Sequence, residues 1–116
     1  MALTTITSRV IAPEFTTSSN LTSAASVAVD WDSSQVFRIT AGHSITFTFS
    51  DFKIGMVKII VATGGGGSHT LTFPTGSINL SGTYDDTAGT KNFIQIVCTD
   101  DDGSPEFFYT ISQPTT

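Results

Sequence analysis

The sequence is poor in cysteine and in charge. Cysteine occurs once, at position 98, so no disulfide can form within the chain, and the alternation around Cys98 predicts a buried strand position rather than a reactive thiol. Charged residues make up 13% of the 116 residues, about half of the share usual in soluble domains. Threonine, serine and glycine supply the remaining polarity, a composition typical of all-β domains.

Basic residues are scarce and scattered. The net charge is −5, and the five basic positions are Arg9, Arg38, Lys53, Lys58 and Lys91. Nucleic-acid binding needs several clustered Lys or Arg side chains that neutralise phosphates together, so this sequence disfavours it. An anionic membrane surface would repel the chain for the same reason.

Long apolar runs are also missing. No segment approaches the roughly 18 to 20 apolar residues of a membrane span. The start of the chain, MALTTITSRVIAPEF, lacks the basic stretch followed by an apolar run that marks a secretion signal. We therefore expect synthesis in the cytoplasm and no membrane partner. A chain of 116 residues is long enough for one core and too short for two.

What is present is an apolar period of two. Alternation recurs from residue 36 onward, and no window has a helical period. About seven short strands separated by turn signals predict an all-β fold, an antiparallel β-sandwich or jelly roll. Residues 21–116 form the expected sandwich domain, and residues 1–20, with their proline and the polar TTSSN, form an expected N-terminal arm.

Two connections read as hairpin turns. The four residues AGHS join the strand expected at Val36 to Thr40 to the one expected at Ile45 to Phe49. The run Gly64 to Ser68 joins MVKIIVA to HTLTF and is expected to be the tip of a second hairpin, with glycine supplying positive φ. A phosphate loop would need a Lys and a Ser or Thr directly after its last glycine and a helix beginning there, and neither follows.

No motif supports catalysis, a cofactor or a metal. His43 and His69 have no second ligand at a zinc-like spacing and are expected to be solvated, and no G-x-S-x-G elbow marks a hydrolase. The acidic run Asp100 to Asp102 could offer oxygens to calcium, but it lacks the D-x-D-x-D-G order and favours a solvated turn. We therefore predict no catalytic residue, no cofactor site and no metal site.

The last expected strand, Glu106 to Ser112, carries aromatic residues on both faces. Neighbouring residues on a strand point to opposite sides, so Phe107 and Tyr109 share one face and Phe108 takes the other. One interpretation is a strand between the core and an overlying loop. The other is a subunit interface to which Phe107 and Tyr109 contribute.

A series of short motifs follows one another along the chain. They are, in order, Val29-Asp30-Trp31, Val36-Phe37, Ile45 to Phe49, Gly55, Gly64 to Gly67, Thr70 to Pro74, Thr87 to Ile96 and Phe107 to Tyr109. Over about ninety residues this series resembles a β-rich module of tailed-phage virion proteins. That module runs V-D-W, V-F, a hairpin, I-T-F-x-F, a loop with Gly, an apolar strand, a Gly-rich turn, T-x-T-F-P, T-x-G-T-x-N-x-I-x-I and an aromatic last strand.

The resemblance implies a structural virion protein with no catalytic residues. A nearly isolated module with an arm fits a capsid cement or decoration protein, bound to the major capsid protein or another virion protein and assembled as a closed homo-oligomer, preferably a trimer. In that hypothesis the arm orders on binding. Its apolar contacts with the partner would be Leu3, Ile6, Val10, Ile11 and Phe15.

Two alternatives remain open. The chain could be a tail-fibre or receptor-binding tip, in which a loop aromatic such as Tyr84 contacts surface glycans. It could also be a free-standing carbohydrate-binding module, with calcium held by Asp100 to Asp102.

Overall fold

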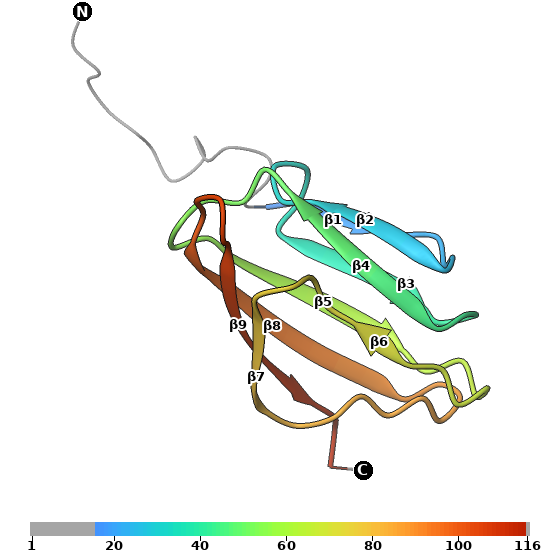
Figure 1. Ribbon diagram of the computed structural model, residues 1–116. Coiled ribbons are helices and arrows are strands. Elements are labelled where there is room, and N and C mark those ends of the chain that lie inside the picture. Colours follow the sequence, from blue (N-terminus) through green and yellow to red (C-terminus); the bar gives the residue numbers. More distant parts are fainter. Residues whose placement is uncertain (1–15, 116) are drawn as a thin grey trace, which may run out of the picture.

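The computed structural model describes residues 16–115, and these form nine strands in two sheets (Figure 1). The described part of the chain contains no helix, and thus none that could cross a membrane. The strands, in chain order, are β1 Ser18–Asn20, β2 Ser26–Asp30, β3 Val36–Thr40, β4 Ile45–Ser50, β5 Val57–Thr63, β6 Leu71–Thr72, β7 Ser77–Ser81, β8 Lys91–Asp100 and β9 Glu106–Ser112.

The chain alternates between the two sheets from β1 to β7. A six-stranded sheet has the order β1-β3-β5-β8-β9-β7, and a three-stranded sheet has the order β2-β4-β6. Among the first six strands the pairs are β1 with β3, β3 with β5, β2 with β4 and β4 with β6, each joining strands two places apart in the chain, and all four pairs are parallel. Only β5 with β8 and β8 with β9 are antiparallel, while β7 pairs with β9 in parallel.

This topology corrects the prediction of an antiparallel fold built from hairpins. Strands β3 and β4 lie in different sheets, as do β5 and β6, so neither AGHS nor the glycine run closes a hairpin. A four-residue connection spans up to about 13 Å, enough to cross the roughly 10 Å between packed sheets. Two alternating strands joined by a short polar loop are therefore as compatible with a crossing to the other sheet as with a hairpin, and here the chain crosses.

One apolar core lies between the sheets and explains the alternation. Phe37 and Ile39 of β3 and Ile60 of β5 point into it from the larger sheet, while Ile45 and Phe47 of β4 enter from the smaller one. Each of these side chains is at most 4% exposed. Full burial of such side chains contributes about 1.5 to 3 kcal/mol each, so the core determines which face of each strand turns inward.

Aromatic rings fill one end of this core. The Trp31 ring lies 5.3 Å from that of Phe49 and 5.5 Å from that of Phe107, and Phe52 also packs against both Trp31 and Phe107. The prediction that Cys98 is buried is confirmed: its side chain is fully enclosed, and burial raises the pKa of the thiol. A thiol with a raised pKa is a poor nucleophile at neutral pH.

The first described residues belong to the sheet. Ser18 to Asn20, which the sequence assigned to the arm, form edge strand β1 and pair in parallel with Val36 to Arg38 of β3. The carbonyl of Thr17 also accepts hydrogen bonds from the amides of Gln35 and Val36. The body of the protein therefore includes these residues, and the remainder of the predicted arm, residues 1–15, lies outside the described residues.

Candidate functional site

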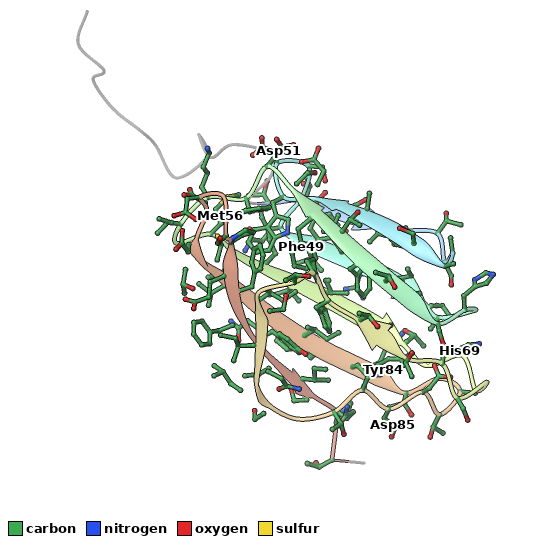
Figure 2. The ribbon with its side chains drawn as sticks, in the orientation of Figure 1. Phe49, Asp51, Met56, His69, Tyr84 and Asp85 are labelled. Atoms are coloured by element: carbon green, nitrogen blue, oxygen red, sulfur yellow. The ribbon has the colours of Figure 1, made fainter. Side chains whose placement is uncertain are left out.

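A hollow of about 760 Å³ opens at the end of the molecule where β5 and β6 are joined. The loop from Thr63 to Leu71 forms one wall, the segment from Gly82 to Thr90 forms the other, and Gln113, directly after β9, closes it. Figure 2 shows His69, Tyr84 and Asp85 together at this end, far from Asp51 and Met56 at the opposite end. The residues lining the hollow are Gly66, Ser68, His69, Thr83, Tyr84, Asp85, Asp86, Thr87, Ala88 and Gln113.

The glycine run surrounds a carboxylate of its own chain. Asp86 Oδ1 accepts the backbone N–H of Gly65 at 3.0 Å, and Oδ2 accepts those of Gly67 at 3.0 Å and His69 at 2.7 Å. The Tyr84 hydroxyl donates to Oδ1 at 2.6 Å. Successive backbone amides that converge on one point make an anion-binding concavity, and here Asp86 occupies it.

The ionisation of Asp86 follows from these contacts. Burial alone would raise the pKa of the Asp86 carboxyl, but the hydrogen bonds from Tyr84 and from the backbone N–H groups of His69, Gly65 and Gly67 outweigh it and lower the pKa. Burial, with the neighbouring Asp86 carboxylate, raises the pKa of the Tyr84 hydroxyl. Asp86 is therefore a carboxylate and Tyr84 a neutral phenol at physiological pH.

Close packing explains why glycine occupies these positions. A Cβ on Gly65 would collide with the carbonyl oxygen of Ala41, and one on Gly64 would collide with that of Thr87. Gly66 has a φ of 86°, in the region that only glycine adopts readily. The run thus permits the loop to pass close to two other backbone segments while it turns its amides toward Asp86.

Asn92 holds the opposite wall of the hollow. Its side chain is fully buried, and its Nδ2 donates to the carbonyls of Ala62 at 3.0 Å and Asp85 at 2.9 Å. Its Oδ1 accepts the N–H of Asp85 at 2.8 Å and the side-chain amide of Gln113 at 2.7 Å. One amide on β8 thereby connects β5, the Gly82 to Thr90 segment and the C-terminal residues.

His69 lies beside Asp86, which corrects the expectation of a solvated histidine. Its Nδ1 is 3.0 Å from Asp86 Oδ2, and its side chain is 22% exposed. A carboxylate and a histidine are two of the three members of a hydrolase triad, but among the described residues no hydroxyl is seen hydrogen-bonded to His69 Nε2, and the side-chain contact of His69 is the one with Asp86. His43, in contrast, is exposed as expected, with Nδ1 2.9 Å from Ser23 Oγ.

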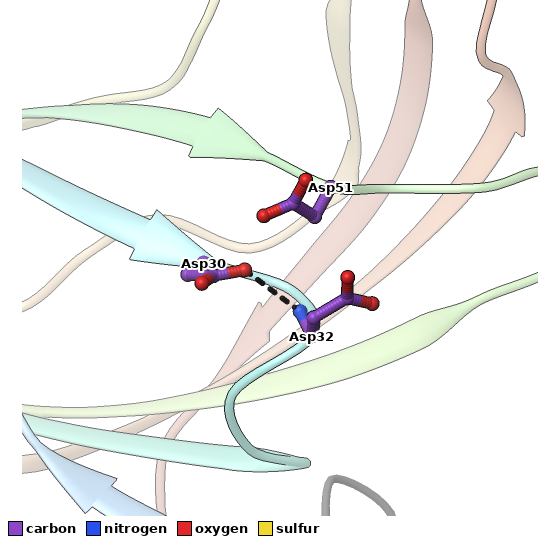
Figure 3. A group of neighbouring side chains, drawn as sticks. All are labelled: Asp30, Asp32 and Asp51. Atoms are coloured by element: carbon purple, nitrogen blue, oxygen red, sulfur yellow. Dashed lines mark hydrogen bonds between the residues drawn. The ribbon is translucent and has the colours of Figure 1, made fainter.

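A second polar group lies at the opposite end of the molecule (Figure 3). Asp30 ends β2, Asp32 follows it, and Asp51 follows β4, so that carboxylate oxygens of all three lie within 4.8 Å of one another. A hydrogen bond to Asp30 and the Asp30 charge raise the pKa of Asp51. All three side chains are exposed. No local sequence pattern indicates this group, because Asp51 is brought to Asp30 only by the parallel pairing of β2 with β4.

The acidic run that the sequence analysis considered for calcium forms a turn. Asp101 Oδ2 accepts the N–H of Ile54, Asp100 Oδ1 accepts that of Asp102, and Asp102 Oδ1 accepts that of Ser104. These bonds use the carboxylates to stabilise the turn between β8 and β9, in agreement with the solvated turn that the sequence favoured.

The residues predicted to contact a partner fall into two groups. Leu3, Ile6, Val10, Ile11 and Phe15 lie outside the described residues. Phe107 is 1% exposed and packs in the core, so the prediction that it lies at an interface is wrong. Tyr109 is half-buried, with its ring 4.4 Å from that of Phe73, and it also faces inward. Only Phe108, which pairs with Val97 and Ile78, turns to the outside.

No protein-family model, no curated protein and no solved structure matches this chain. Any assignment to a class of protein therefore depends on the residues and their arrangement.

Proposed function

We propose that this chain is a structural virion protein of a tailed bacteriophage, a capsid cement or decoration protein without catalytic activity. One observation supports a role in assembly: the six-stranded sheet carries apolar side chains on the face turned away from the core, including Phe93 at 45% exposure and Ile78 at 41%. Contiguous exposed apolar surface marks interaction sites on soluble proteins. The phage assignment itself depends on the resemblance to the virion module.

The polar groups of the molecule fit a rigid, non-enzymatic body. Asp86 and Asn92 are saturated by hydrogen bonds to their own chain, which stabilises loops and leaves neither free to act on a substrate. We interpret the two sheets around one core as a sandwich-like body, made in the host cytoplasm and carried on the virion. The proposal includes closed self-association, with a trimer as the arrangement that the resemblance implies.

Shell binding tests the cement hypothesis. Purified full-length protein is added to phage capsids that lack it, and bound protein is measured by co-sedimentation. We expect saturable binding that Ile6→Asp together with Val10→Asp abolishes, because charged residues would prevent apolar contacts by the arm. Asp32→Asn, an exposed change on the body, is the matched control. Absence of wild-type binding would overturn the cement hypothesis, and undiminished binding by the arm variant would overturn the role of the arm.

The second candidate is a receptor-binding tip, and the hollow favours it. Tyr84 lines this hollow beside His69 and Gln113, and ligand pockets combine aromatic side chains with a few placed polar groups. The expected result is glycan binding by the free protein that Tyr84→Ala removes and Tyr109→Phe retains. A glycan array without signal at high protein concentration would contradict this candidate.

A further inference from the structure

The outer face of the six-stranded sheet carries two apolar rows with one row between them. Cross-strand partners point to the same side of a sheet, and the register places Ile78, Phe108, Val97 and Val57 side by side across β7, β9, β8 and β5. Two rows further along the strands, Phe93 of β8 lies beside Val61 of β5, and Ser112 and Arg38 flank this pair. We call these six apolar residues, with the row of Ile59 and Gln95 between them, the outer face.

Two of these six side chains are exposed and the other four are half-buried. Among residues 16–115 only four large apolar side chains are exposed, and two of them, Ile78 at 41% and Phe93 at 45%, belong to the outer face. A third, Leu80 at 61%, lies two residues along β7 from Ile78. Apart from the buried Lys58, strand β5 is apolar on both sides, as is usual for a strand that is covered on both sides.

The two ends of the outer face carry opposite charges. Lys91 begins β8 at one end, where its Nζ donates to Thr63 Oγ1 at 3.1 Å. Glu106 begins β9 at the other end, where its carboxylate accepts the Thr99 hydroxyl at 2.8 Å. Within the described part of the chain neither forms an ion pair. Each end is therefore available to a partner of the opposite charge.

We propose that a second copy of this chain packs on the outer face with its strands running in the opposite direction. The twofold axis would lie between the two outer faces, perpendicular to the strands and along the row of Gln95 and Ile59. It would place Phe93 and Val61 of one copy against Val97 and Val57 of the other. The same rotation brings Lys91 of each copy to the end that carries Glu106 of the other. If both copies ran in the same direction, Lys91 would instead face Lys91.

The size of the outer face is sufficient for a weak dimer. The four strands that carry it, about 4.8 Å apart, and six residues of about 3.3 Å along each give a surface of the order of 400 Å² per copy. Two such surfaces bury on the order of 800 Å², the range of weak, transient interfaces. The dimer is therefore concentration-dependent. The twofold pairing goes beyond the proposed function and stands in place of the trimer that the resemblance implies.

Light scattering and sedimentation of the full-length protein test the proposal. We expect a dimer at high concentration, and Phe93→Ser should raise its dissociation constant about tenfold or more, because burial of the ring is lost. Ile54→Ser is the matched control, since Ile54 is more exposed, at 63%, and lies outside the outer face. Ile78→Ser, on the edge strand, is the second variant should Phe93→Ser fail to fold.

Charge reversal tests the direction of the strands. Lys91→Glu alone should weaken the dimer about tenfold, and the double change Lys91→Glu with Glu106→Lys should restore it. A wild-type monomer at every concentration, a trimer, or a double variant as weak as the single one would overturn the proposal. Shell binding is a separate readout, so a dimer that binds no shell would contradict the cement hypothesis and support the twofold pairing.

Discussion

At the scale of single residues, Asp86 stabilises the two loops around the hollow. Three backbone N–H groups from residues 65–69 and one hydroxyl converge on its carboxylate. A charged acceptor makes such hydrogen bonds stronger than a neutral one does. The loop therefore depends on the ionised form of this one side chain.

Asp86→Asn should lower the free energy of unfolding by about 2 to 4 kcal/mol at pH 7, because an amide nitrogen cannot accept the backbone N–H bonds. The lowered pKa of Asp86 means that its contribution is complete above about pH 4, the range of an unperturbed aspartate, and is lost as the pH falls toward the folded-state pKa. Chemical denaturation at several pH values from about 3, below the unperturbed aspartate pKa, to about 7 measures this loss of stability.

In the same experiment the difference between wild type and Asp86→Asn should shrink in acid. Asp32→Asn is the control, because the Asp32 carboxylate accepts no hydrogen bond that is seen among the described residues and lies beside Asp30 and Asp51, so its removal should not lower stability. A difference that stays constant with pH would contradict the role of the ionised carboxylate.

Gly65→Ala tests the close approach of the glycine loop. The added methyl group would overlap the carbonyl oxygen of Ala41, so the loop or the strand must move, and we expect a loss of about 1 to 3 kcal/mol. Gly103→Ala is the matched control, because a Cβ there meets nothing within 4 Å. Equal melting temperatures of the two variants would contradict this account of the loop.

At the scale of elements, the Asn92 side chain connects β5 and β8 to segments that lie outside the backbone hydrogen bonds of the strands. Its side chain bonds to Ala62 on β5, to Asp85 in the Gly82 to Thr90 segment, and to Gln113 after β9. Buried polar groups with all partners in place make a unique arrangement more stable than its alternatives.

Asn92→Ala should therefore lower stability by about 2 to 4 kcal/mol, because it removes these bonds and leaves buried backbone groups without partners. Hydrogen exchange should accelerate at Asp85 and its neighbours while β2 and β4 stay protected. Asn79→Ala is the control, since Asn79 is exposed and its side chain makes one bond, to the Gly82 carbonyl. Uniform acceleration across both sheets would contradict a local role.

At the scale of the whole molecule, charge is distributed unevenly. Asp30, Asp32 and Asp51 lie at the end where Ile54 contacts Asp101, so these acids and the acidic turn between β8 and β9 share one end. Lys53 is the exposed basic residue at that end. Like charges held close together repel and destabilise the folded state.

Asp51→Asn should raise the melting temperature at pH 7 because it removes one repelling charge, and asparagine tolerates the φ of 60° at this position. The pKa of Asp51 is raised, so its carboxylate opposes folding above the unperturbed range near pH 4 and ceases to do so once it is protonated. The gain should vanish in acid and diminish in high salt. Asp101→Asn, which removes an acceptor for Ile54, should not stabilise the protein.

The sequence by itself determined the strands and their buried faces. Val36 to Thr40 and Glu106 to Ser112 were predicted with the bounds that the structure has, and Phe37, Ile39 and Cys98 face the core as their alternation indicates. Apolar side chains at every second position are enough for this, because burial of one face stabilises an extended strand wherever its partner lies.

Only the tertiary structure decided which strands pair, in which direction, and what the glycine run does. Nearly every residue offers the same backbone N–H and C=O groups, so the backbone of β3 could hydrogen-bond equally well to β4 or to β5, and here it pairs with β5. The short loop after β3 permits either pairing. The concavity around Asp86 arises when the chain crosses between sheets and brings residue 86 to residues 65–69. Contacts between such distant positions leave no local signal in the sequence.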